Sequence, residues 1–263
     1  MTQLPMRPMA LALALATITS SRTHAQASRI ALTRLQSASY VERRAGFYTL
    51  LSTPDSGCIS QTTRPLRVCV QEFAAYATRY REVGRRVIAL LQRENTHQEE
   101  LVSEDRYHGD LIAAVAGLHD PSAVDALMGA INTGYIATHG LAMLGDAAVP
   151  SVIAAASASR MLTRDAALST LSDMVTVTPA PTLSSTNRAR IRAVMLEALT
   201  DSNRFAREWA VEGLSAFNDS EARAAIARVA ASDPFVVHDE GRARYPVREA
   251  AVAALRKLDQ KRG

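Results

Sequence analysis

Histidine and acidic side chains are the residues of this sequence with the chemistry to bind a metal or transfer protons. The chain contains six histidines, and one of them, His238, is followed directly by Asp239 and Glu240. A zinc site needs three or four ligands in a fixed geometry, and the sequence has neither H-E-x-x-H nor cysteine-rich spacing. It also lacks a glycine-rich phosphate loop and a G-x-S-x-G motif. We therefore predict surface histidines in turns, with no catalytic residue, no metal site and no cofactor.

Three pairs of an arginine followed by an acidic residue recur in the second half of the chain, 43 and 41 residues apart. One interpretation is a charged ladder that binds a polar or acidic partner. The other, which we favour, is that the pairs link neighbouring repeats, where an exposed ion pair contributes about 0–1 kcal/mol. The single tryptophan, Trp209, is either an interface anchor or, as we prefer, a core residue. The candidate partner-binding residues are therefore Arg164, Asp165, Arg207, Glu208, Trp209, Arg248, Glu249, His238 and Asp239.

The two cysteines, Cys58 and Cys69, are eleven positions apart. The segment 54–69 that contains them is rich in Pro, Gly, Ser and Thr, which do not support regular structure. In an exported protein, the simplest role of such a pair is a disulfide, and closing so small a loop contributes roughly 2–3 kcal/mol. A redox-active pair is the alternative, although no C-x-x-C motif is present.

The first 27 residues resemble a secretory signal peptide in their order of features. Arg7 precedes an apolar run, Met9–Ile18, and a polar segment then ends in Ala25-Gln26-Ala27. A membrane anchor is the alternative, but ten apolar residues cover about half of the ~20 that a spanning helix needs. We expect cleavage after Ala27, export to the periplasm or beyond, and no membrane insertion after cleavage.

The net charge gives no indication of nucleic-acid binding. The formal charge is +4, and it falls to +2 without residues 1–27, which hold Arg7 and Arg22 and no acidic residue. Nucleic-acid-binding proteins gather basic residues on one face, whereas here arginine and acidic residues are interspersed along the chain.

The elements that hold these residues are predicted by a repeated pattern. In six segments a small residue precedes a leucine by four positions, which places both on one face of a helix, one turn apart. The small residue lets a neighbouring helix approach, and the leucine fills the space beside it. Because one such helix cannot bury its apolar face alone, we predict stacked helices. The pairs are Gly46 and Leu50, Ala114 and Leu118, Gly140 and Leu144, Ala167 and Leu171, Ala210 and Leu214, and Ala251 and Leu255.

A second set of helices is predicted to alternate with these, over 123–131, 149–157, 188–199 and 221–231. Asp120, Asp201 and Asp219 supply side-chain oxygens for helix starts, and Pro150 suits an opening turn. Segment 66–101 indicates one or two longer helices, and 176–186 an extended loop. Residues 235–245 carry β-formers on both sides of Asp239-Glu240-Gly241, which predicts a small β-hairpin insertion.

The stretches GLAMLGDAAVPSVIAA and YPVREAAVAALRKL resemble HEAT and HEAT-like repeats, including the phycobilin-lyase type. The resemblance implies a right-handed superhelix whose second helices line a concave face that binds other proteins. Repeats of this family run near forty residues, whereas the leucines here are first 26 and 27 residues apart and then 43 and 41. We expect one repeat domain over 28–263, irregular over 28–104 and clearer over 105–258.

The resulting prediction is an all-α solenoid that acts as a non-enzymatic scaffold in a bacterial cell envelope. It binds a protein partner, whose identity the sequence does not indicate, along the concave face. Two alternatives stay open: a lyase-like protein that handles a chromophore or another ligand, and a structural module that assembles with itself.

Overall fold

A computed structural model describes residues 26, 28–51, 73–77, 80–96, 106–178, 181–239 and 242–260. The expected signal peptide, apart from Gln26, and the expected disulfide between Cys58 and Cys69 in segment 54–69 lie outside these residues and stay predictions. The chain divides into two compact units, Met1–Leu118 and His119–Gly263. Each unit is described by itself.

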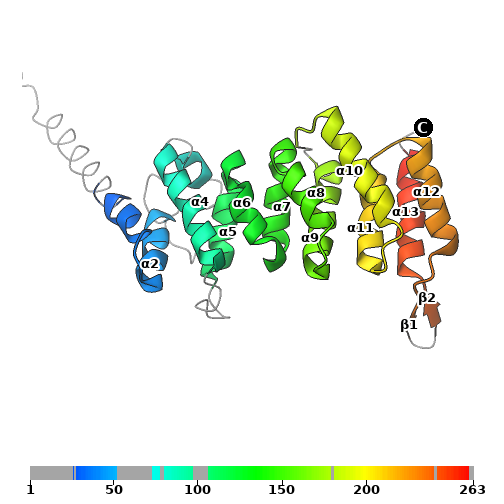
Figure 1. The fold of residues 1–263 in the computed structure, drawn as a ribbon, viewed down its shortest axis with the longest axis horizontal. Helices are drawn as coiled ribbons and strands as arrows, with labels where there is room; N and C mark the ends of the chain where they lie inside the picture. Colours follow the sequence, from blue (N-terminus) through cyan, green and yellow to red (C-terminus); the bar gives the residue numbers. More distant parts are fainter. Residues whose placement is uncertain are drawn as a thin grey trace, which may run out of the picture. The chain divides into compact units, whose positions relative to one another are not determined.

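Three helices of the first unit are labelled in Figure 1: α2 (Tyr40–Leu51), α4 (Arg81–Thr96) and α5 (Tyr107–Gly117). Residues 28–34 and 73–77 are also helical. Helix α4 confirms a longer helix within segment 66–101, and its Val83, Val87, Leu90 and Leu91 are all buried. Helix α4 packs against α5, whose buried Tyr107 meets the ring of Phe47 from α2 edge-on at 5.6 Å.

The second unit consists of helices joined by short turns, with one small hairpin (Figure 1). Its elements are η3 (Pro121–Ala123), α6 (Val124–Gly129), η4 (Ile131–Thr133), α7 (Tyr135–Met143), η5 (Gly145–Ala147), α8 (Val149–Ala156), α9 (Met161–Thr176), α10 (Ser185–Ala198), α11 (Arg204–Leu214), α12 (Ser220–Ser232), β1 (Val237–Asp239), β2 (Arg242–Arg244) and α13 (Pro246–Gln260). The alternation of first and second helices predicted from the sequence is confirmed.

The order of packing in this unit follows the order of the chain. Helices α7, α9, α11 and α13 contact one another in succession, and α6, α8 and α10 do the same. Each second helix also packs on the first helix before it, as α9 does on α8, α11 on α10 and α13 on α12. Every helix therefore buries its apolar side against neighbours in sequence, which is the arrangement of an α-solenoid.

The small residues of the repeated pattern are buried in all six second helices, as predicted. At Gly46 an added Cβ would come within 2.8 Å of the Arg34 Cβ, so the preceding helical segment needs a glycine there. The leucines of the pattern differ in how deeply they are buried. Leu50, Leu171 and Leu214 are fully buried, whereas Leu118, Leu144 and Leu255 are only half-buried. Leu255 lies on α13, the last helix that the structure describes.

The Gly145-Asp146 break between α7 and α8 holds the next repeat in place. Gly145 has φ +56°, and an added Cβ would lie 2.5 Å from the carbonyl oxygen of Thr182. The Asp146 carboxylate accepts hydrogen bonds from the Ser184 N–H at 2.9 Å and from Asn187 Nδ2 at 2.8 Å. The turn before α8 is thereby tied to the start of α10.

The hairpin and two of the three aspartate caps match the sequence prediction, whereas residues 179–180 of the predicted loop 176–186 lie outside the described residues. Strands β1 and β2 pair antiparallel, with Val237 opposite Arg244, so the predicted hairpin is confirmed. Asp120 and Asp219 accept from the backbone N–H groups of Ser122 and Ala222. Helix α11, however, is capped by Asn203 and not by Asp201. Within the described ranges, no helix combines the length and apolar character that crossing a membrane requires.

Candidate protein-interaction site

Arg207 lies inside the junction between two repeats. Its side chain is 8% exposed, and its Nε and Nη2 donate to the Asp233 carboxylate at 2.6 and 3.0 Å. Its Nη1 donates to the carbonyl oxygens of Asp201 at 2.7 Å and Ser202 at 3.2 Å. Burial acts to raise the pKa of Asp233, but the hydrogen bonds from Arg207 and from the Phe235 N–H outweigh it, so this pKa lies below its usual value. The guanidinium therefore joins the start of α11 to the end of α12.

The other two arginines of the predicted pairs also bind neighbouring segments. Arg164 forms an ion pair with Asp201, with 3.0 Å between Nε and Oδ2. Arg248 donates from Nε to the Asp233 carbonyl oxygen at 2.6 Å, and its guanidinium lies 4.2 Å from the Tyr245 ring centroid. Arg164 and Arg207 thus bind the next repeat, as the second of the two interpretations above predicts, whereas Arg248 binds the end of α12 in its own hairpin.

The first unit contains the same arrangement at Arg43, which sequence reasoning missed. Arg43 is 1% exposed and donates to Glu94 from Nε at 2.6 Å. Its Nη1 donates to the carbonyl oxygens of Ser37 and Ala38, six and five residues before it, just as Arg207 does to Asp201 and Ser202. The signal was available, because Arg43 stands three residues before Gly46, as Arg207 stands three before Ala210.

The acidic members of the predicted pairs bind residues other than their sequence neighbours. Asp165 accepts from Asn203 Nδ2 at 2.5 Å, Glu208 pairs with Arg204 at 2.7 Å, and the exposed Glu249 pairs with Arg244 at 2.7 Å. Desolvation raises the pKa of Asp165, against the effect of its hydrogen bond from Asn203. Adjacent position in the sequence therefore does not make these residues ion-pair partners.

Trp209 is half-buried rather than part of the core, which corrects the preferred sequence interpretation. It lines a groove of about 580 Å³ between α11 and α13. The alanines Ala166 and Ala250 occupy the same repeat position and are also half-buried, so this position faces outward from the layer of second helices. The groove is lined by Arg204, Glu208, Trp209, Val211, Glu212, Ser215, Pro246, Glu249, Ala250, Ala253, Ala254 and Lys257.

The groove at Trp209 therefore brings together three of the predicted partner-binding residues: Glu208, Trp209 and Glu249. The half-buried Trp209 shares the groove with small side chains of α13, among them Ala250 and Ala253. Carboxylates stand on both helices, with Arg204 and Lys257 as the cationic side chains of the lining. The two predicted residues of the insertion lie elsewhere, His238 exposed on β1 and Asp239 at the end of that strand.

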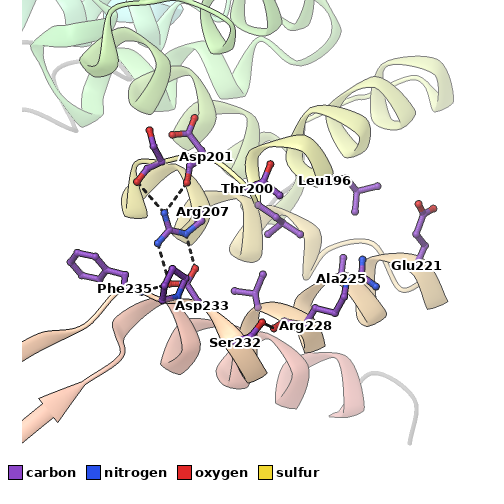
Figure 2. A pocket seen from close by; sticks show the side chains of 14 residues that line it. Leu196, Thr200, Asp201, Arg207, Glu221, Ala225, Arg228, Ser232, Asp233 and Phe235 are labelled. Atoms are coloured by element: carbon purple, nitrogen blue, oxygen red, sulfur yellow. Dashed lines mark hydrogen bonds and ion pairs between the residues drawn. The ribbon is translucent and has the colours of Figure 1, made fainter.

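A second groove, which was not predicted, lies between α10 and α12 and has a volume of about 740 Å³ (Figure 2). Apolar side chains such as Leu196 and Ala225 contribute to its lining, and the exposed Arg228 and Glu221 stand among them. Figure 2 shows Arg207 at one end, between Asp201 and Asp233. A smaller groove of about 320 Å³ contains the Arg164–Asp201 pair one repeat earlier.

In the residues that the structure describes, no group of three or more His, Cys, Asp or Glu side chains is placed to hold a metal ion. His108 lies half-buried in α5, not in a surface turn, and its Nε2 is 3.0 Å from Asn95 Oδ1. Burial lowers the pKa of His108. His139 of α7 stacks on Tyr135 with 5.3 Å between the ring centroids.

The successive packing of α7, α9, α11 and α13 defines the second unit as a helical-repeat protein of the α-solenoid class. No family model matches the chain, and no curated protein sequence matches it. Among solved structures, it is similar to a designed armadillo repeat protein, with 13% identity, a TM-score of 0.45, and coverage of 87% of this chain and 98% of the other. An engineered protein shows 13% identity and a TM-score of 0.45, with 89% and 97% covered. The fold assignment rests on the chain's own helix packing.

Proposed function

We propose that the chain is a non-enzymatic scaffold that binds a protein partner through the layer of second helices in the second unit. The observation that carries this proposal is the groove between α11 and α13, in which the only tryptophan of the chain is half-buried beside charged side chains. Tryptophan is among the residues that contribute most to binding at protein interfaces, above all where neighbouring groups exclude water from it.

The chemistry of the groove suits a polypeptide segment. An indole with small alanines opposite it offers a flat apolar contact, and carboxylates on both helices accept hydrogen bonds from backbone or basic side chains. Arg204 and Glu208 of α11 already pair with each other at 2.7 Å, so these two side chains are ordered before a partner arrives. Less ordering on binding leaves more of the contact energy as affinity.

We further propose that this scaffold is HEAT-like and acts in the envelope of a bacterium, in the periplasm or secreted. The support is the apolar run Met9–Ile18 followed by Ala25-Gln26-Ala27. The intact mass of the protein purified from its cells tests this proposal. A chain that begins at Ser28 agrees with export, and a chain that retains residues 1–27 contradicts it.

The binding function is tested by affinity capture from envelope extract with matched variants. The wild-type chain should retain a distinct protein that the Trp209→Ala variant loses. Arg256→Ala serves as the control, because Arg256 is an exposed residue of α13 outside the groove. Equal capture by all three proteins would place binding elsewhere. A visible absorption band in the purified protein would instead support the chromophore-handling alternative.

A further inference from the structure

Helix α13 exposes apolar side chains at repeat positions that α9 and α11 bury. The position directly after the small residue of the repeated pattern holds Leu168 in α9 and Val211 in α11, and both are 1% exposed. Val252 holds this position in α13 and is 39% exposed. Leu255, three positions later, is half-buried, whereas its counterparts in α9 and α11 are fully buried. A surface that joins repeats elsewhere is therefore accessible on α13.

In α9 and α11 these positions face the repeat that follows. Leu168 lines a groove together with residues of α10, and Val211 lines the groove that α11 shares with α13. Four positions earlier, Arg164 and Arg207 form ion pairs with acidic residues of the following repeat. Because side chains four positions apart share one helix face, the same face of α13 is suited to pack against a further helix. Figure 1 shows α12 and α13 at one end of the second unit.

The accessible residues of α13 form one stripe along the helix. At about 100° per residue, positions separated by four, three and four residues fall on one side of a helix. This side lies opposite Lys257, which lines the groove with α11, and it excludes Arg256. We call the following four residues the end stripe: Arg248, Val252, Leu255 and Asp259.

We propose that the end stripe packs against the end stripe of a second copy of the chain, with the two α13 helices antiparallel about a two-fold axis. The stripe is self-complementary, because Arg248 stands four positions before Val252 and Asp259 stands four positions after Leu255. The two-fold arrangement places Val252 on Leu255 of the other copy, and it places Arg248 beside Asp259 of the other copy. This contact continues the packing of α9 on α11 and of α11 on α13.

The charged ends of the stripe are compatible with this contact. Asp259 binds Arg223 of α12 through Oδ1, and its side chain is 65% exposed, so its carboxylate can accept from a second guanidinium. Arg248 donates from Nε to the Asp233 carbonyl oxygen, and a guanidinium has further N–H donors. A hairpin end about 20 Å long and two helices wide offers less than the ~800 Å² per partner of a stable interface, so we expect a micromolar dissociation constant. The end stripe is separate from the groove at Trp209, and this inference does not rest on the proposed function.

Analytical ultracentrifugation of the full chain from about 1 to about 200 µM tests the proposal, and the wild-type protein should pass from monomer to dimer over this range. Val252→Asp should weaken the dimer by at least about tenfold, because it puts a charge in the apolar middle of the contact. Leu162→Asp is the matched control, since Leu162 is 58% exposed on α9 outside the end stripe, and it should leave the dissociation constant within about twofold. A chain that stays monomeric throughout, or a dimer that Val252→Asp leaves intact, contradicts the proposal.

Exchanged charges separate the two-fold contact from any other self-association. Arg248→Asp and Asp259→Arg each place like charges opposite one another in a dimer of identical copies, so each variant alone should associate at least about tenfold more weakly than the wild type. An equimolar mixture should form a mixed dimer within about threefold of wild-type affinity, because the exchanged charges then attract. Circular dichroism checks the fold of each variant. A mixture that associates no more strongly than either variant alone overturns the proposal.

Discussion

Single arginines carry the linkage between repeats in both units. The guanidiniums of Arg43 and Arg207 each bind a buried carboxylate and two carbonyl oxygens from the turn before their own helix. Neighbouring stretches of helix are held by such contacts because the carbonyls of a turn have no helical partner of their own. The acidic partner stands far away in the sequence, 51 residues from Arg43 and 26 from Arg207.

Removing the buried partner of Arg207 should therefore cost much more than removing an exposed pair. We expect Asp233→Ala to lower the free energy of unfolding by about 3–5 kcal/mol, because it leaves the guanidinium buried without its counter-charge. Glu249→Ala breaks the exposed pair with Arg244 and should cost about 0–1 kcal/mol. Urea unfolding followed by circular dichroism measures both values. Equal losses would show that Arg207 is not a structural linker.

The contacts of Asp219 predict the direction in which the stability of the fold changes with pH. Arg192 donates two hydrogen bonds of 2.9 Å to the carboxylate and, together with the Ala222 N–H, lowers the pKa of Asp219 to about 2, against an ordinary 3.8. Because the folded pKa is depressed, the stabilisation is complete above pH 3.8 and is lost as the pH falls toward 2.

The variant Asp219→Asn should thus be less stable than the wild type at pH 7, and the difference should shrink as the pH falls from about 4 to 2. Urea midpoints at several pH values measure it. A difference for Asp219→Asn that stays constant down to pH 2 would contradict the assigned ion pair.

The turns between helices set the register of the stack, and Gly145 is the clearest case. Ala at this position would adopt φ +56° and would place its Cβ 2.5 Å from the Thr182 carbonyl oxygen. The left-handed conformation alone costs about 1–2 kcal/mol, and the clash adds to it. We expect Gly145→Ala to lower the unfolding free energy by more than about 2 kcal/mol. Gly109→Ala, in helix α5 with open space around the added methyl, should be neutral or stabilising.

The free energy of unfolding that is lost on replacing each second-helix leucine with alanine should increase with the burial of that leucine. Leu171→Ala and Leu214→Ala remove fully buried side chains and should each cost about 2–5 kcal/mol. Leu255→Ala removes a half-buried side chain from the last described helix and should cost clearly less. Thermal and urea unfolding of the three variants check this order. A loss at Leu171 no larger than at Leu255 would mean that these helices do not cover one another as described.

Most helices and the hairpin could be predicted because the sequence patterns that indicate them are local. The small residue four positions before a leucine identified every second helix, and the turn residues around Gly241 predicted the hairpin. The cap of α11 was misplaced by two residues, because Asp201 is engaged by Arg164 and Asn203 takes its place. At the candidate site, Trp209 was assigned to the core although Ala166 and Ala250 at the same repeat position face outward. Arg164 and its partner Asp201 lie 37 residues apart, and no local sequence pattern predicts such a pair.

At the scale of the molecule, each repeat contributes one part of a continuous surface and one part of a continuous core. In the second unit, the core is built from small and branched residues along α7, α9, α11 and α13. The groove beside Trp209 lies between two members of this layer, α11 and α13, whose Arg207 and Arg248 both bind Asp233. A scaffold of the kind that we propose would bind by shape and charge, without making or breaking a bond.

The most direct test of partner binding in the groove is site-specific photo-crosslinking in the cells that produce the protein. A benzophenone side chain placed at Trp209 should give one discrete crosslinked species after illumination, because a partner occupies the groove between α11 and α13. The same side chain placed at Arg256, exposed on α13 outside the groove, should give none. An adduct that forms at position 256 and not at 209, or no adduct at position 209, would contradict the central claim that partners bind along the second helices.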